Sequence, residues 1–562
     1  MARLQGKTLF FITSPRTPMK MQPEIELLVE KFSGRTWNTK CQEEFIACLA
    51  TDPRFEGVGS VSDPAFSARD RINRGPKALG FVDIKPTIAL TDAGQNFLDE
   101  ELCQEALLRQ MLKFQLPSPY HTETSNNSSY FCVKPYLEIF RLIYTLGHIT
   151  FDELMIFGMQ LVRYSDFESI VEKIRHFRQA KEDSRVSYKT FMGQYRDNEL
   201  MEIYADEIQA GNTRTRESRD TSIAKFIKTK ASNLRDYTDA CFRYLRATGI
   251  ISLSQKGKSL SILPEKEREV EFFLANIDRK PVFIDEEAQY KQYLFNAELP
   301  VLYTDNRQNL IAEVTRLGLL PPHTIATSDI PTLKKALKQA TKQRKEALIS
   351  QQVETLKDYR AYTDVMEVFT EIRQNGYYDV PLMLEWNTWR AMTMLDGGNI
   401  HANLKFDDEG QPLSTATGNM ADIVCDYGDF SLTVEVTMQT GQRQYESEGE
   451  PVSRHLAKVK REQSKEAFCF FIAPTINPSC IAHFFTLHLA NIAFYGGKSV
   501  IIPIELEVFE KMVEQSHRAS YIPDPQQIKA FCDYSMQIAS TAQSETEWYE
   551  AIKAKALNWL AA

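Results

Sequence analysis

The stretch from Ala421 to Thr437, ADIVCDYGDFSLTVEVT, constrains the fold more than any other part of the chain, because it predicts a single β-hairpin. Gly428 followed by Asp429 is a Gly-X pair of the kind that closes a two-residue type II′ turn. From that turn, side chains alternate between the two faces of the hairpin. One face is then apolar, with Tyr427 opposite Phe430, Cys425 opposite Leu432, Ile423 opposite Val434 and Ala421 opposite Val436.

The other face of this hairpin places Asp422 opposite Glu435. Directly opposed like charges destabilise a hairpin, so a compensating partner is expected. A divalent cation shared by both carboxylates would compensate, because Mg²⁺ is typically held by one or two carboxylates together with phosphate and water oxygens. The alternative is a solvated polar face on a surface hairpin.

The segments around the hairpin predict an α/β architecture, in which apolar faces pack against a central sheet. The predicted elements are a helix at 381–395, a basic helix at 451–466 with Pro451 in its first turn, a buried strand at 467–473, a helix at 480–494 and a strand at 499–504.

This order, with twelve residues between Asp422 and Glu435, resembles the PD-(D/E)xK nuclease core, except that Thr437 stands where the usual pattern has lysine. Several longer blocks resemble the AlwI-type family of type IIS restriction endonucleases, which includes the PleI and BstNBI enzymes and nicking relatives. These blocks are SPRTP (14–18), FSARDR (66–71), LTDAGQNFL (90–98), RYLRATGI (243–250), LEWNTW (384–389), GNMADIVCDY (418–427), VEVT (434–437) and EPVSRHL (450–456). The resemblance also implies that a site without the lysine is normal.

The resemblance implies a type II site-specific deoxyribonuclease that uses Mg²⁺, reads a short asymmetric duplex site and hydrolyses phosphodiesters a few base pairs outside it. Its catalytic residues would be Glu385, Asp422, Glu435 and Glu448, and the metal would be bound by Asp422, Glu435 and Glu448. Two alternatives stay open: a strand-specific nicking enzyme or large subunit of a heterodimer, and a catalytically silent DNA-binding regulator.

Two of these acids also have readings that follow from their neighbours. Glu448 precedes Pro451, near the expected N-terminal end of the basic helix, where the positive end of the helix dipole favours a carboxylate. It would then belong either to the metal site or simply to the helix cap. Glu385 lies beside two tryptophans on an expected buried helix, where an unpaired carboxylate is costly. It is therefore expected to face the metal site or to pair with Arg390. His455 and Lys458 of the basic helix either bind phosphate or belong to a solvated face.

The formal net charge of −9 argues against a nucleic-acid partner until its distribution is considered. Basic residues cluster at 1–23, 66–77 and 213–246, which indicates a localised phosphate-binding surface in the N-terminal half. The candidate contacts to double-stranded DNA are Arg16, Arg69, Arg71, Asn73, Arg74, Arg214, Arg216 and Arg219. Arg and Lys suit guanine, and Asn and Gln suit adenine.

Residues 43–98 and 231–262 each predict helices followed by a short two-stranded segment, which is the order of a winged helix. The alternative is a set of small helical subdomains with solvated basic faces. We therefore predict a multidomain α+β chain: a winged-helix-like DNA-recognition domain at 1–280, a helical linker at 281–355 and a PD-(D/E)xK-like catalytic domain at 356–562.

The remaining composition bounds the setting of the protein. No run of eighteen apolar residues occurs, so a membrane span is not expected. The nine cysteines include no C-x-x-C pair, which argues against a disulfide framework and a structural zinc site. These features favour a cytoplasmic protein. The chain lacks a heptad stripe, so we expect a monomer in solution that pairs transiently on DNA or joins a small partner subunit.

Overall fold

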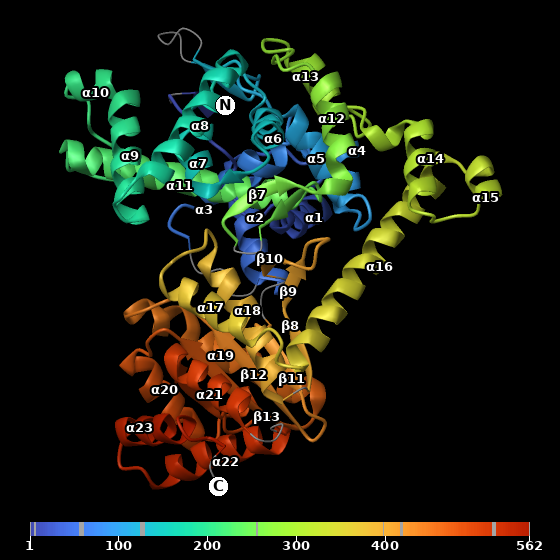
Figure 1. Cartoon of the computed structure of the whole chain (residues 1–562). Helices are drawn as coiled ribbons and strands as arrows, with labels where there is room; N and C mark the ends of the chain where they lie inside the picture. Colours follow the sequence, from blue (N-terminus) through green and yellow to red (C-terminus); the bar gives the residue numbers. More distant parts are fainter. Residues whose placement is uncertain are drawn as a thin grey trace. The chain divides into compact units, whose positions relative to one another are not determined.

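The computed structural model describes residues 2–4, 7–55, 61–123, 130–254, 257–396, 398–415, 420–519 and 524–560, and it mixes helices with small sheets (Figure 1). The chain divides into two compact units. The first comprises Met1–Leu49 and Ser60–Lys342, and the second comprises Ala50–Gly59 and Gln343–Ala562. The predicted α+β class is confirmed at this level, and the three-domain division stays a prediction.

The second unit is built on a five-stranded sheet in the order β14-β13-β12-β11-β8 (Figure 1). Antiparallel pairing joins β11 to both β8 and β12, whereas β12, β13 and β14 run parallel. The strands are β8 (Asn399–Ala402), β11 (Ile423–Asp426), β12 (Phe430–Val436), β13 (Glu466–Ala473) and β14 (Ile501–Glu505). A separate small hairpin pairs β9 (Leu404–Phe406) with β10 (Pro412–Thr415).

Helices connect and cover this sheet. From β12 the chain passes through α19 to β13, and from β13 through α20 to β14, which are the helical crossovers that parallel strands require. The helices of the unit are α17 (Tyr362–Arg373), α18 (Val380–Asp396), α19 (Gln442–Gln463), α20 (Pro478–Leu489), α21 (Leu506–Arg518), α22 (Pro525–Thr541) and α23 (Glu545–Ala556). In β13 every residue after Glu466 is buried, which confirms the strand predicted from the apolar run at 467–473.

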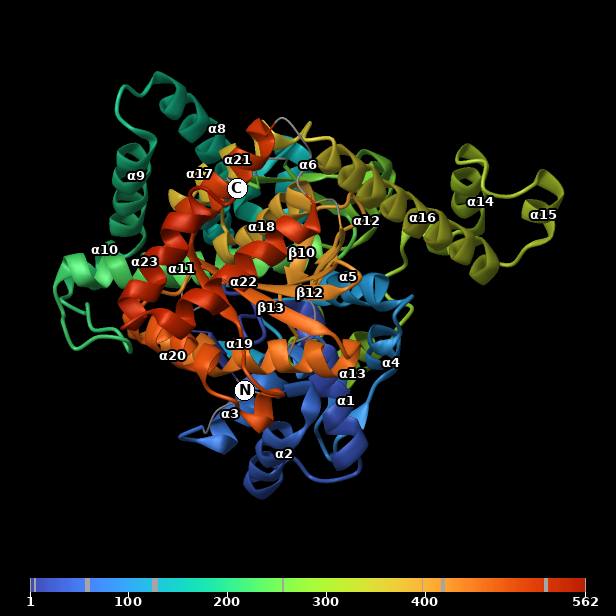
Figure 2. The ribbon, with the colours of Figure 1, turned by 90° about the horizontal axis from the view of Figure 1, so that it is seen from below.

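The predicted hairpin register is confirmed in the structure. Ile423 pairs with Val434, Cys425 with Leu432, and Asp426 with Ser431. Gly428 at the turn has a φ of 82°, which glycine adopts without strain. The alternative of a solvated polar face is wrong for β12, because Ser431 and Thr433 of that face are fully buried. α19 packs on these strands, and Figure 2 shows it running beside β12 and β13.

The predicted start of the basic helix is wrong. Helix α19 begins at Gln442, so Pro451 lies inside it and not in its first turn. Residues 442–450 (QRQYESEGE) are mostly good helix formers, which extends the helix upstream. A proline inside a helix removes one hydrogen bond, here to the carbonyl of Ser447, but need not end the helix. Glu448 is consequently not a residue of the helix N-terminus.

The first unit is mainly helical and contains the two short strand pairs predicted from the sequence. Val82 of β2 (Val82–Asp83) pairs with Leu90 of β3 (Ala89–Leu90), and this pair follows α3 (Pro64–Ile72). β6 (Ile251–Leu253) pairs with β7 (Ser259–Ile262) directly after α11 (Ile223–Arg246), and β5 (Ile149–Thr150) completes a three-stranded sheet. The remaining large helices of the unit are α1 (Met21–Phe32), α2 (Thr39–Thr51), α4 (Asp92–Leu98), α5 (Cys103–Lys113), α6 (Pro135–Leu146), α7 (Phe151–Ile156), α8 (Phe167–Asp183), α9 (Tyr188–Ile203) and α12 (Glu267–Asn276).

The segment expected to link the two halves contains α13 (Glu287–Phe295), α14 (Arg307–Arg316), α15 (Pro322–Thr327) and α16 (Ile330–Lys357), which are joined by non-helical stretches. An ionic network holds the start of α16 to α5. Lys334 lies 2.6 Å from Asp305 and 3.0 Å from Glu105, and Arg109 lies 2.8 Å and 2.6 Å from the same two carboxylates. All four side chains are at least three-quarters buried, so the two positive and two negative charges neutralise one another away from bulk water.

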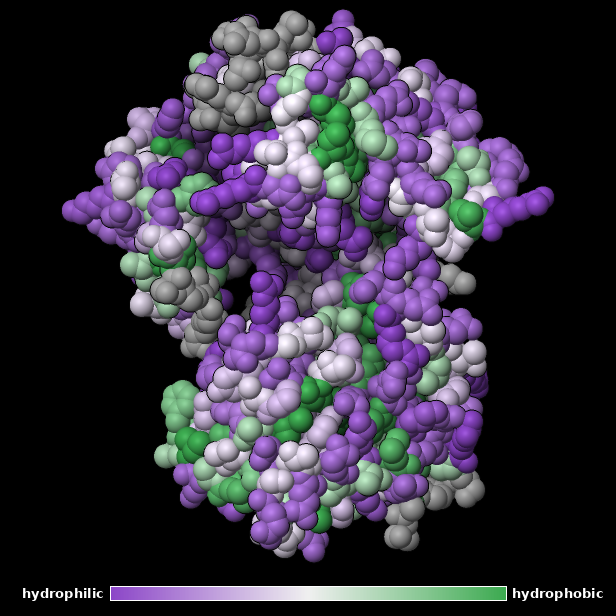
Figure 3. Space-filling model, turned by 90° about the vertical axis from the view of Figure 1, so that its left-hand side faces the viewer, coloured by the Kyte–Doolittle hydropathy of each residue, from purple (hydrophilic) through white to green (hydrophobic). Residues whose placement is uncertain are grey.

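Across the part of the chain that the structure describes, every helix is too short or too polar to span a lipid bilayer. On the face shown in Figure 3, hydrophobic residues form scattered patches between hydrophilic side chains.

Gly94 in the first turn of α4 allows the helix to approach the chain of residue 81. A Cβ at this position would stand 2.0 Å from the carbonyl oxygen of Phe81. We expect Gly94→Ala to lower the free energy of unfolding by about 1–3 kcal/mol, the range typical of overpacking. The matched control is Gly193→Ala within α9, where a Cβ meets no atom within 4 Å. That variant should gain about 0.5–1 kcal/mol. Denaturant unfolding of both variants measures the difference, and equal stability would contradict the close approach.

Candidate active site

The hairpin holds two of the four predicted acids at one end of the sheet. Asp422 directly precedes β11, and its Oδ2 accepts a 2.8 Å hydrogen bond from the backbone N–H of Val436. On its other side, the Asp422 carbonyl accepts a 2.7 Å bond from the backbone N–H of Asn403, just beyond β8. Glu435 is the penultimate residue of β12 and is 5% exposed. Both carboxylates are therefore fixed by the backbone of adjacent strands.

Helix α19 brings Glu448 and His455 to the same two acids. Their spacing of seven residues is close to two helical turns, so both side chains lie on one face. His455 Nδ1 lies 2.8 Å from Oε1 of Glu435. The Glu448 carboxylate is close enough to raise the pKa of both Asp422 and Glu435. The structure thus brings together Asp422, Glu435 and Glu448, three of the four predicted catalytic acids.

These carboxyl groups strongly perturb one another. Burial raises the pKa of Asp422 well above its usual range, and the charge of Glu435 raises it further. Burial likewise raises the pKa of Glu435 well above its usual range, with Glu448 as the next cause. Burial also raises the pKa of Glu448, against the hydrogen bonds of Thr437 and Ser447, which lower it. Burial, with a smaller contribution from neighbouring carboxylates, therefore disfavours the ionised forms of Asp422 and Glu435.

Thr437 occupies the position where the nuclease pattern usually has lysine, and it has a defined place in the site. Its Oγ1 accepts a 3.0 Å hydrogen bond from the backbone N–H of Gln439. Its hydroxyl also bonds to the Glu448 carboxylate, lowering the pKa of that group. Sequence reasoning missed this contact because it placed Glu448 at the start of a helix. Had the helix been predicted to start at Gln442, the seven-residue spacing of Glu448 and His455 would have placed both side chains on one face of it.

The fourth acid, Glu385, is half-buried on α18, and α18 packs against β8 and β12. Arg390, its predicted partner, donates hydrogen bonds to Asp364 and Asn387 and stacks over the ring of Trp386. The role of Glu385 at the site stays a prediction.

The chemistry of the donor set fits a divalent cation. Among the described residues, no three acidic, histidine or cysteine side chains already form a metal-ligand cluster. Mg²⁺ does not need such a cage, because it usually keeps several waters and takes one or two carboxylates. Burial is the main cause that raises the pKa of Asp422 and of Glu435 and so disfavours their charged forms, which a bound cation would favour.

The structure places the eight candidate DNA contacts in two groups. Five of them are held by partners within the first unit. Arg16 pairs with Asp236 and Asp239, Arg69 donates to Gln42, Arg71 pairs with Glu24, Asn73 accepts from Trp37, and Arg74 pairs with Asp70. Their long side chains are oriented by these contacts.

The other three candidates, Arg214, Arg216 and Arg219, lie in the segment between α10 (Ala205–Gln209) and α11 and are exposed. Arg216 is the most exposed of the paired arginines at 84%, and Glu217 lies 3.6 Å away. Exposed arginines of this kind are available to a polyanion. Whether any of the eight candidates contacts DNA stays a prediction.

The raised pKa values predict how stability changes with pH. A carboxyl group whose folded-state pKa is raised stabilises the fold at low pH, and this stabilisation is lost as pH rises through the folded pKa. Without metal, the free energy of unfolding should therefore fall as the pH rises from about 4, the unfolded-state pKa of Asp and Glu, through the higher folded-state pKa values. At pH 8 Glu435→Gln should therefore be more stable than the unmodified chain.

Thermal melts in EDTA test this expectation. The control is Asp429→Asn at the exposed tip of the same hairpin, which should melt like the unmodified chain at every pH. If Glu435→Gln and the unmodified chain melted at the same temperature at pH 8, the Glu435 carboxylate would not be destabilising the fold.

Comparison with known proteins places this chain in a family. One solved structure, the small subunit (R.BspD6I2) of the heterodimeric restriction endonuclease R.BspD6I, is 25% identical over 35% of this chain and 95% of its own. Its TM-score of 0.28 is too low to support conclusions about this chain. A comparison with curated proteins gave no match. The profile of the AlwI restriction endonuclease family matches residues 77–512, which is most of the chain and includes all four acids. The chain therefore belongs to the AlwI restriction endonuclease family, and it is a DNA-cleaving hydrolase.

Proposed function

We propose that this chain is a Mg²⁺-dependent type IIS endonuclease, which reads a short asymmetric duplex site and cuts a few base pairs outside it. The observation that carries the proposal is the placement of Asp422 opposite Glu435 with Glu448 beside them, in a different compact unit from the basic clusters. We further propose that the sheet of the second unit is a PD-(D/E)xK core. In support, its acid-bearing hairpin leads through a helix into parallel strands.

The chain's own residues would bind and orient the reacting groups. Asp422 and Glu435 would hold Mg²⁺, with Glu448 completing the shell. When bound, the cation would supply an activated water and would neutralise charge on the transition state. His455 fixes the Glu435 carboxylate through Oε1, and Thr437 fixes Glu448. In this proposal Thr437 takes the place of the usual lysine as a positioning residue, and Glu385 orients the water or joins the shell.

The first unit would read the DNA. Its two helix-and-strand-pair segments, α3 with β2–β3 and α11 with β6–β7, support a winged-helix-like reader. Because reading and cutting then belong to separate units, the cut would lie outside the site that is read.

A catalytically silent DNA-binding regulator is the weaker alternative. A regulator would have no use for a group of acids whose burial raises their pKa, since withdrawing carboxyl groups from water destabilises the fold. How many DNA strands the enzyme cuts is a separate question. One chain carries one set of acids, so we propose that the monomer either nicks one strand or pairs transiently on DNA with a second catalytic unit.

The proposed roles of the acids are tested by Asp422→Asn and Glu435→Gln. Each variant should reduce plasmid cleavage by on the order of 10³-fold, the cost of removing a group that stabilises the transition state. Binding of the specific duplex should stay nearly unchanged, because the basic clusters lie in the other unit. Asp429→Asn, seven residues from Asp422, is the matched control and should cut at the normal rate. Normal cleavage by either site variant in Mg²⁺ would refute the metal site.

The exposed arginines are tested by replacing Arg214, Arg216 and Arg219 with glutamine together. Each lost phosphate contact should lower the slope of log affinity against log salt by about 0.9, so the triple variant should lose roughly 2–3 units of slope. Arg175→Gln on α8 is the control, because Arg175 is 56% exposed and pairs with Glu172, a surface glutamate. An unchanged slope in filter binding would remove this segment from the DNA interface.

The number of strands cut is tested by varying enzyme concentration on a supercoiled plasmid. If two chains pair on DNA, nicked circles should accumulate at low enzyme and linear product should rise faster than in proportion to enzyme. If the monomer is a nicking enzyme, nicked circles should be the final product. A stable dimer in sedimentation without DNA, with linear product proportional to enzyme, would contradict both.

A further inference from the structure

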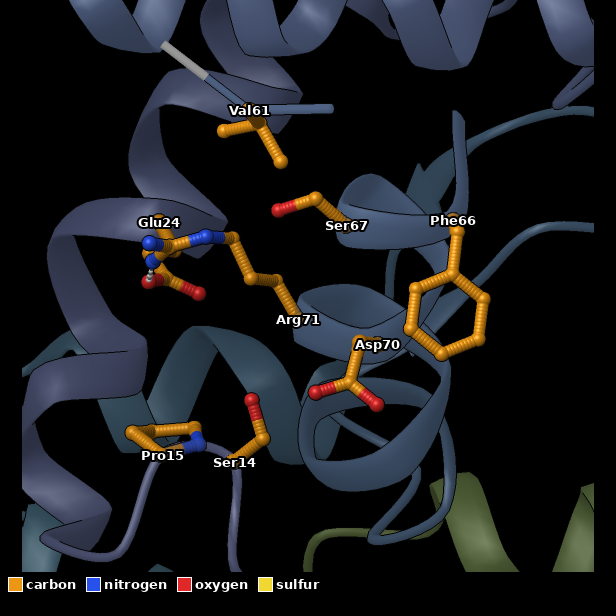
Figure 4. A pocket seen from close by; sticks show the side chains of 8 residues that line it. All are labelled: Ser14, Pro15, Glu24, Val61, Phe66, Ser67, Asp70 and Arg71. Atoms are coloured by element: carbon orange, nitrogen blue, oxygen red, sulfur yellow. Dashed lines mark hydrogen bonds and ion pairs between the residues drawn. The ribbon is translucent and has the colours of Figure 1, made fainter. Parts of the chain in front are cut away.

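A pocket in the first unit joins two sequence blocks that are far apart in the chain. It has a volume of about 320 Å³ and is lined by Ser14, Pro15, Glu24, Val61, Phe66, Ser67, Asp70 and Arg71 (Figure 4). Apart from Val61, which precedes α3, the lining residues belong to the SPRTP block (14–18), to α1 and to the FSARDR block (66–71) on α3. Neither the catalytic acids nor the exposed arginines contribute to it.

A buried carboxylate oxygen in this pocket has no partner. Glu24 is 4% exposed, and its Oε1 is paired with the guanidinium of Arg71. Its Oε2 finds no hydrogen-bond donor among the described residues, and Figure 4 shows this oxygen turned toward the cavity. Leaving a buried acceptor unsatisfied costs free energy, so the geometry calls for a donor from outside the chain.

More accessible groups lie beside this oxygen. Asp70 is 26% exposed, with its Oδ1 2.6 Å from Nε of Arg74. In Figure 4 the Asp70 carboxylate and the Ser67 hydroxyl both face the cavity. The ring of Phe66 is 51% exposed, which is unusual for a phenylalanine and leaves an apolar surface at the rim. The pocket thus combines hydrogen-bond acceptors with an open aromatic ring.

The charge balance of the pocket limits what it can bind. Glu24 is paired with Arg71 and Asp70 with Arg74, so the carboxylates are already neutralised and a divalent cation gains little. A phosphate gains little as well, because the guanidinium groups of Arg71 and Arg74 are already paired with these carboxylates. A neutral N–H donor fits best, and in DNA such donors are the exocyclic amino groups of cytosine and adenine, which the major groove exposes. Aspartate and glutamate accept from cytosine N4, and serine can bond to either base.

We propose that this pocket reads the exocyclic amino group of one cytosine or adenine in the recognition site, with Asp70 as the first acceptor and Glu24 deeper in the cavity. The inference rests on the proposed function, in which the first unit reads DNA. Ser67 supplies a further hydrogen bond and Phe66 packs against the base or its neighbour. Arg71 and Arg74 are in this view positioning residues, which hold the two acceptors in place.

The experiment removes the amino group from the DNA and the acceptor from the protein. Run-off sequencing of the digested plasmid defines the specific duplex. Each adenine in it is then replaced by purine and each cytosine by 2-pyrimidinone, one position at a time. The unmodified chain should lose about 10- to 100-fold in affinity at one position, as for loss of a base contact. Asp70→Ala should bind the natural duplex more weakly by a similar factor. The analogue at that position should not weaken the binding of Asp70→Ala any further.

Ser67→Ala is a second variant, which leaves both ion pairs intact and should show a smaller loss coupled to the same base. Glu172→Gln on α8 is the control, since Glu172 is 69% exposed and lies in an isolated surface pair. Thermal melts confirm that each variant is folded. For each variant, the loss of affinity with the analogue can equal the product of the loss from the analogue alone and the loss from the substitution alone. If this holds at every position for both variants, the pocket does not read an amino group and the inference is overturned. A chain that shows no site-specific cleavage at all would overturn the proposed function as well.

Discussion

The placement of several carboxyl groups away from bulk water at one end of the sheet is the constraint on which the second unit depends. Asp422 and Glu435 are pressed together by strand pairing, and Glu448 is added from α19. The fold tolerates this cost because the surrounding structure is strongly apolar: β13 is buried on both faces and anchors the strand that carries Glu435. Hydrogen bonds from Val436 and His455 orient the carboxylates without neutralising them. The arrangement stores repulsion that a cation could release, which is the usual relation between an active site and the core that supports it.

The first unit uses its charges in the opposite way. Most of its candidate DNA-contacting side chains are held in ion pairs or hydrogen bonds, so they are oriented before any ligand arrives. Among the eight candidates, the three arginines of the segment between α10 and α11 are exposed to solvent with little restraint. The restrained residues can define the geometry of a contact with DNA, whereas the exposed arginines mainly supply electrostatic attraction. DNA-binding proteins commonly divide these two roles among different residues.

Much of the second unit could be predicted from sequence, because its signals are local. Alternation with a period of two and the Gly428 turn fixed the hairpin register, and an unbroken apolar run identified β13. The start of α19 could not be predicted correctly, because Pro451 was taken as a helix start, whereas the structure carries the helix through it. The contacts of Thr437 with Glu448 and of Arg71 with Glu24 depend on tertiary packing and left no trace in spacing. The long-range partners of charged side chains could therefore not be predicted from the sequence.

Helix α16 has a consequence for how the chain folds. Its first thirteen residues, up to Lys342, belong to one compact unit and the rest to the other, yet the helix is continuous from Ile330 to Lys357. Starting a helix is costly, whereas extending one is cheap. The Lys334 and Arg109 network fixes the start of α16, so residues beyond Lys342 can extend a helix that already exists. The two units therefore share part of their folding free energy and should not unfold as fully independent domains.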